Sequence, residues 1–167
     1  ERGPYYARGL VSLAHALGAA GLRERARRWI EWTLGSQRGD GSFGPPDNDD
    51  WWARMPMLEA LRWHAEATGD ERVVPFLARY FHYQHAQLPG RPLRMWARPR
   101  GGDNLDSVLW LYNRTGEAFL LEPHGDGVGQ APALGDGEVA GVGAGAGDDV
   151  ADELGARVGH ADGVEAG

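Results

Sequence analysis

One design occurs three times in this chain, and that repeat constrains the fold more than any other feature. Each copy holds the end of an amphipathic helix, a stop of small residues and glycine, and the beginning of the next helix. The copies lie in residues 13–22, 61–73 and 111–120, a spacing of about fifty residues that is typical of stacked helical hairpins. Because one hairpin cannot bury its apolar face alone, the sequence predicts an all-α array of hairpins.

Apolar residues at helical spacing predict five helices, and no alternation of useful length predicts a strand. The helices are expected over about residues 4–17, over 22–34, from about 50 to the stop at 68–69, from 73 onward, and over 105–112. The residues expected to be buried are Tyr6, Leu10, Leu13, Ala14 and Leu17 in the first helix; Leu22, Ala26, Trp29, Ile30 and Thr33 in the second; Met55, Leu58, Leu61 and Ala65 in the third; Val73, Phe76, Leu77, Tyr80 and Phe81 in the fourth; and Leu105, Val108, Leu109 and Tyr112 in the fifth.

Composition changes abruptly near residue 121. All seven tryptophans, five tyrosines and four phenylalanines precede this point, whereas 37 of the 43 residues in 125–167 are Gly, Ala, Val, Asp or Glu. Codons for these five begin with G, and the chain has no lysine, as expected of a GC-rich gene. We therefore expect residues 1–121 to form the domain and 122–167 to be a frameshifted translation or, alternatively, an acidic Gly/Ala-rich linker. Both interpretations predict a disordered Gly/Ala/Asp-rich tail.

Charge and composition exclude several classes of partner. The formal net charge of −7 comes from the tail, and the first 121 residues are slightly positive, which gives no support for a nucleic-acid or anionic-membrane partner. No apolar run approaches the ~18 residues that a membrane span needs. There is no cysteine, hence no disulfide and no thiolate zinc site in this chain. Localisation and oligomeric state stay open.

The connections between the helices alternate in length. Tight turns are expected at 18–21, 68–70 and 115–117, whereas residues 37–50 and 88–103 form long connections that carry Trp, Arg and Asp. Loops of this length in compact helical proteins are usually functional or disordered. Since both lie on one side of the hairpins, we expect them to form the walls of a cleft.

The first long connection suggests sugar contacts through Asp47, Trp51, Trp52 and Arg54. A flat amphipathic ring beside carboxylates and a guanidinium suits a polyhydroxylated ligand. Adjacent helical positions diverge by about 100 degrees, so one indole is expected in the core and the other outside it. Asp49 and Asp50 serve equally well as helix N-caps.

The second long connection leads through an arginine-rich segment to Asp103 and Asn104, which we add to the candidate substrate-binding residues. The alternative is that Asp103 caps the fifth helix and that the arginines are simply solvated. His82 and His85 are three residues apart, but no carboxylate at helical spacing completes a metal site. No metal is therefore assigned within this chain.

Several short motifs together resemble the amino-terminal part of the catalytic domain in the beta-L-arabinofuranosidase family, glycoside hydrolase family 127. They are Glu1-Arg2-Gly3-Pro4-Tyr5, Asp50-Trp51-Trp52-Ala53-Arg54-Met55, Ala67-Thr68-Gly69-Asp70-Glu71-Arg72-Val73, Arg79-Tyr80-Phe81, Gly101-Gly102-Asp103-Asn104 and Trp110-Leu111-Tyr112. The resemblance covers residues 1–121.

This resemblance implies a partial (α/α)6 toroid of the six-hairpin glycosidase type and retaining hydrolysis of a glycosidic bond, with L-arabinofuranosides as one candidate substrate. It also implies, for the full-length protein, a zinc-bound cysteine nucleophile and a glutamate acid/base, both later in the chain. No catalytic residue can be placed in this sequence, and the fragment is expected to be inactive by itself. The alternatives are a helical-repeat interaction module and another α/α-toroid enzyme such as a polysaccharide lyase.

Overall fold

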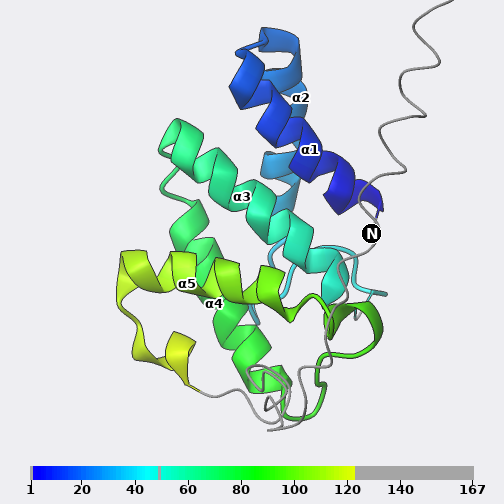
Figure 1. Cartoon of the computed structure of the whole chain (residues 1–167), viewed down its shortest axis with the longest axis vertical. Coiled ribbons are helices and arrows are strands. Elements are labelled where there is room, and N and C mark those ends of the chain that lie inside the picture. The colour runs from blue at the N-terminus through cyan, green and yellow to red at the C-terminus, as the bar shows by residue number, and fades with distance from the viewer. Residues whose placement is uncertain (1, 49, 123–167) are drawn as a thin grey trace, which may run out of the picture. The chain divides into compact units, whose positions relative to one another are not determined.

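A computed structural model of the chain describes residues 2–48 and 50–122, and this part contains helices and loops but no strand (Figure 1). The prediction of an all-α fold is therefore confirmed. Of the segment 122–167, only Glu122 is described, so the predicted disorder of that tail lies outside the described residues. The elements are α1 (Arg2–Leu17), α2 (Ala20–Gly35), η1 (Trp52–Arg54), α3 (Met55–Thr68), α4 (Val73–Gln87), η2 (Met95–Ala97), α5 (Gly101–Thr115) and η3 (Ala118–Leu121), where η denotes a 3-10 helix.

The five α-helices form two layers. Helices α1, α3 and α5 lie next to one another in chain order and run in the same direction, as Figure 1 shows. Helix α2 packs against α1, and α4 packs against α3 and α5. Because α3 has neighbours on both sides within its layer, it is buried over most of its length.

The three predicted helix stops have a common backbone conformation. Gly18, Gly69 and Gly116 adopt left-handed φ values of 63, 71 and 68 degrees. Gly69 and Gly116 donate their N–H groups to carbonyl oxygens four residues earlier, at 2.8 Å in each case. Glycine takes this conformation without the penalty that a Cβ atom imposes, so the repeat predicted from the sequence corresponds to repeated left-handed helix caps.

The predicted buried residues are confirmed for α4 and, apart from the partly buried Leu22, Trp29 and Ala65, for α2 and α3. Those of α1 and α5 are confirmed only in part. In α1, Leu10 and Ala14 are buried as expected, together with Ala7 and Val11, whereas Tyr6, Leu13 and Leu17 are exposed. The physical reason is that α1 packs against both α2 and α3, and small side chains permit the closest approach of helices. In α5, Val108 is buried as expected, together with Asn104, Ser107 and Leu111, whereas Leu105 and Leu109 are 45% and 42% exposed.

Two predicted helix starts also need correction. Helix α5 begins at Gly101, so Asp103 lies in its first turn and does not cap it. The segment from residue 52 first forms η1, and α3 begins only at Met55. Asp50 does act as a local cap, because its side-chain oxygen accepts the backbone N–H of Trp52 at 3.0 Å. None of the described helices is both long and apolar enough to cross a bilayer.

Candidate functional site

The two long connections meet at one end of the helix array. Trp51, at the end of the first connection, donates its indole N–H to the carbonyl oxygen of Arg91 in the second, at 2.7 Å. The Arg91 guanidinium also lies over the Trp51 ring, 3.8 Å from its centroid. The prediction that these connections share one end of the fold is thus confirmed by direct contact.

Both indoles of the Trp51–Trp52 pair are buried, with exposed fractions of 2% and 3%. The expectation that one of them leaves the core is wrong. The two rings point in different directions, but other side chains pack over each of them. Trp51 lies under Arg91 and beside Tyr83. The Trp52 ring instead contacts Tyr5, with centroids 5.5 Å apart, and the Arg100 guanidinium at 4.4 Å.

The other candidate residues do not gather around one ligand position. Arg54 is buried and donates to the carbonyl oxygens of Asn48 and Asp50, so it holds the first long connection against η1. Asn104 is buried and exchanges side-chain hydrogen bonds of 3.0 and 3.3 Å with Gln84 of α4. Asp47 and Asp103 are exposed. Among the six predicted residues, these two have the accessibility that ligand binding requires.

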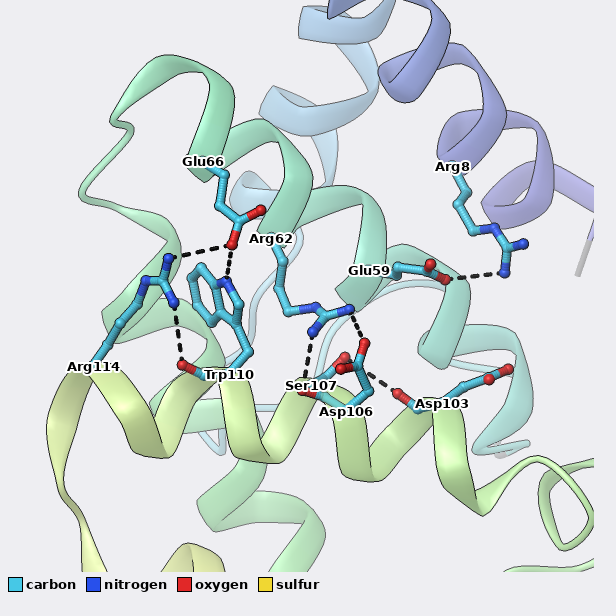
Figure 2. A network of polar contacts seen from close by, with 9 residues as sticks. All are labelled: Arg8, Glu59, Arg62, Glu66, Asp103, Asp106, Ser107, Trp110 and Arg114. Carbon is cyan, nitrogen blue, oxygen red and sulfur yellow. Dashed lines mark hydrogen bonds and ion pairs between the residues drawn. The ribbon is translucent and has the colours of Figure 1, made fainter.

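A different group of charged side chains, which includes Asp103, lies on the layer formed by α1, α3 and α5 (Figure 2). We call it the Glu59 face and define it by Arg8, Glu59, Arg62, Asp103 and Asp106. Arg8 of α1 pairs with the Glu59 carboxylate of α3 at 3.0 Å. Arg62 donates to the carboxylate of Asp106 and, at 2.9 Å, to its backbone oxygen. Three helices therefore contribute to one polar surface.

The pKa of Glu59 is raised above its ordinary value. Burial is the largest cause, and the negative charges of Asp103 and Asp106 add to it, while Arg8 and Arg62 act in the opposite direction. Glu59 consequently holds a proton more readily than an ordinary glutamate, beside acids that accept hydrogen bonds. Carboxyl groups perturbed by burial and neighbouring charge are concentrated at functional sites.

Sequence reasoning missed Arg8, Glu59, Arg62 and Asp106. The sequence held a usable signal for two of them. Glu59 and Arg62 are charged residues inside the run MPMLEALRWHA (residues 55–65), which is otherwise mostly apolar. A charged residue inside a buried helix needs a partner. The partners come from α1 and α5, and the sequence does not place them.

A small cavity of about 250 Å³ lies at the same end, between the beginning of α1, the second half of α2 and the first long connection. Its lining is mainly apolar, and the side chain of Arg54 forms part of the wall. Two of the N–H groups of this guanidinium are already engaged by carbonyl oxygens of the first long connection. The main lining residues are Trp29, Trp32, Phe43, Pro45, Arg54 and Met57.

The described residues do not fit the zinc centre that the family resemblance implies for a full-length protein. No group of three or more His, Cys, Asp or Glu residues in 2–48 and 50–122 is placed to hold a metal ion. His82 instead stacks on Phe119, with centroids 3.8 Å apart, and lies 3.3 Å from the Glu117 carboxylate. His85 lies 3.7 Å from the carboxylate of Glu122.

Comparison with known proteins identifies no relative: no family model matches the chain, and no significant match was found among curated proteins or solved structures.

Proposed function

We propose that this chain forms part of the catalytic domain of an (α/α)6-toroid glycoside hydrolase, and that the Glu59 face lines its substrate cleft. Two features of the fold support the proposal. Helices α1, α3 and α5 run in the same direction in one layer, as the inner helices of such a ring do, and α2 and α4 pack against them as outer helices. The long connections lie together at one end, where a cleft would open.

The observation that carries the proposal is the environment of Glu59. Its carboxyl group is partly buried, its pKa is raised, and it lies between Arg8 and the acids of α5. Asp103 and Asp106 provide acceptors for sugar hydroxyl groups, and Arg8 provides donors. Tyr5, which is 40% exposed and packs edge-on against the Trp52 ring, provides a ring surface for sugar C–H groups. This combination suits a polyhydroxylated ligand.

In this proposal the chain contributes substrate contacts and not the reacting pair. L-arabinofuranosides are the first substrates to test, because they follow from the family resemblance. The 167-residue chain alone is expected not to hydrolyse aryl arabinofuranosides or other aryl glycosides. Enzyme-like hydrolysis by the purified chain would refute the assignment of its role as a cleft wall.

Calorimetric titration of the full chain with neutral oligosaccharides, including arabinofuranosyl oligomers, tests the proposal. E59Q and D103N are each expected to weaken binding about tenfold, which is the effect of one lost charge-assisted hydrogen bond. E71Q is the matched control, because Glu71 is exposed near the opposite end of α3. Absence of binding to every oligosaccharide, or equal weakening by E71Q, would overturn the proposal.

An interaction module remains the second candidate because of one observation. Leu105 and Leu109 are one turn apart on α5, and both are about half exposed, so they form an apolar stripe suited to another helix. If this stripe is the functional surface, the chain should self-associate or bind a helical partner and bind no sugar. Sedimentation velocity of the wild type and of L105S/L109S would detect such self-association.

A further inference from the structure

The second long connection carries a concentration of positive charge without acidic residues. We call residues 91–100 the arginine loop; it contains Arg91, Arg94, Arg98 and Arg100, and residues 88–102 include no Asp or Glu. Within the described part of the chain, none of these four arginines forms an ion pair with a carboxylate. By contrast, each arginine of the Glu59 face pairs with an acid.

Aromatic rings hold two of the four guanidinium groups in place. Arg91 lies over Trp51 and near the Tyr83 ring. Arg100 lies 4.4 Å from the centroid of Trp52 and 4.9 Å from that of Trp96. Stacking on a ring orients a guanidinium but does not neutralise its charge, so the loop keeps its capacity to bind an anion.

The tip of the arginine loop is exposed and apolar. Met95 and Trp96 are 84% and 58% exposed, and Met95 has a φ of 47 degrees, which is unfavourable for a residue with a Cβ atom. Strained and exposed backbone of this kind is found at ligand-binding segments. The exposed guanidinium groups of Arg94 and Arg98 flank this tip in the sequence.

The arginine loop is continuous with the Glu59 face. Arg100 contacts Trp52, the Trp52 ring contacts Tyr5, and Arg8 lies 5.9 Å from the Tyr5 ring. In the chain, the loop leads directly into the first turn of α5, which carries Asp103. A ligand that spans both surfaces would therefore meet uncompensated cations at one end and a mixture of acids and arginines at the other.

We infer that the arginine loop binds an acidic sugar, a uronate, of a glycan held by the Glu59 face; this rests on the function proposed above. Arg94 and Arg98 bind the carboxylate, and the exposed face of Trp96 contacts the sugar ring. Guanidinium groups bind carboxylates through paired hydrogen bonds. A nucleic acid is disfavoured, because its regularly spaced phosphates would also meet Asp103 and Asp106.

The test compares two forms of one oligosaccharide on the full 167-residue chain. Calorimetry would measure an otherwise neutral oligosaccharide that ends in a single galacturonate and the same oligosaccharide after reduction of its carboxyl group to an alcohol. We expect the acidic form to bind about tenfold more tightly, and R94Q/R98Q to abolish this preference. R27Q/R28Q on α2 is the control, because it removes the same charge from an exposed surface and should leave the preference unchanged.

The outcomes separate this inference from the proposed function. If both forms bind equally and binding still depends on Glu59, the uronate assignment fails and the sugar-binding proposal stands. If neither form binds and no neutral oligosaccharide binds, both fail. Equal affinity for an oligonucleotide of matched charge, or full competition by equimolar inorganic phosphate, would show a general anion surface and would also overturn the inference.

Discussion

The turn between α3 and α4 and the arginine loop differ in how their arginines are paired. At the short-turn end, Arg72 pairs with Asp70 at 2.7 Å and with Glu31 at 2.8 Å, and His64 lies 3.4 Å from Asp70. At the long-loop end, Arg94 and Arg98 have no carboxylate partner among the described residues. The turn between α3 and α4 closes its ion pairs internally, and the arginine loop leaves charge available to a ligand.

Two carboxyl groups show what this difference means for stability. The pKa of Asp70 is lowered to about 2, mainly by its hydrogen bonds with Arg72, so its ionised form stabilises the fold. The pKa of Glu59 is raised, mainly by burial, so its ionised form destabilises the fold. The fold therefore keeps a destabilising charge at Glu59. Functional sites commonly keep such groups, because activity there is gained at the expense of stability.

Replacing Trp51 with alanine should have the largest effect, because this indole joins the two long connections. Its ring is 2% exposed, and its N–H bonds the Arg91 carbonyl oxygen. W51A is expected to lower the free energy of unfolding by about 3–5 kcal/mol, measured by urea denaturation. Trp32, which is 56% exposed, provides the control W32A. A loss below about 1 kcal/mol for W51A would show that the long-loop end is not fixed by this contact.

The substitution G41A tests the packing of the first long connection against α4. Gly41 has a φ of 91 degrees, and an added Cβ atom would overlap the carbonyl oxygen of Arg79. We expect a loss of about 2 kcal/mol from backbone strain and displacement of the loop. G44A is the matched comparison, because Gly44 has a φ of 80 degrees but open space around it. Equal thermal shifts in the two variants would argue against the close approach.

D70N probes the short-turn end through its pH dependence. Since the folded-state pKa lies below the ordinary value of 3.8, the stabilisation by Asp70 is present above pH 4 and is lost as the pH falls towards 2. At neutral pH, D70N should cost about 1 kcal/mol, because the exposure of Arg72 reduces the full linkage value. Below pH 2 it should match the wild type. E71Q should show no comparable loss, and a pH-independent effect of D70N would contradict the ion-pair assignment.

The smallest expected effect is a gain of stability from E59Q. The raised pKa of Glu59 means that its contribution to stability is complete below about pH 4.5 and is lost as the pH rises through the folded-state pKa. Glutamine cannot ionise, so the melting temperature of E59Q should exceed that of the wild type at pH 7 and approach it at pH 4. A lower melting temperature at pH 7 would show that the Arg8 ion pair outweighs burial.

Particular residues show how far the sequence could be interpreted. Val73, Phe76, Leu77, Tyr80 and Phe81 were expected in the core and are buried, so the apolar spacing of α4 predicted its packing face. In α1 and α5 the apolar spacing was right for Leu10 and Val108 but wrong for Leu17 and Leu105, because the neighbours that cover each helix are set by the tertiary structure. In the candidate site, Asp103 was found on an accessible surface, and Glu59 was missed because its partners lie on other helices.

The sequence alone determined the helical class, the hairpin repeat and the glycine stops, because helical periodicity and left-handed caps depend on residues that are neighbours in the chain. The tertiary structure decided that both Trp51 and Trp52 are covered, and that Arg8, Glu59 and Asp103 share one surface. Burial and electrostatic coupling of this kind arise from groups some fifty residues apart in the chain, which no local pattern specifies.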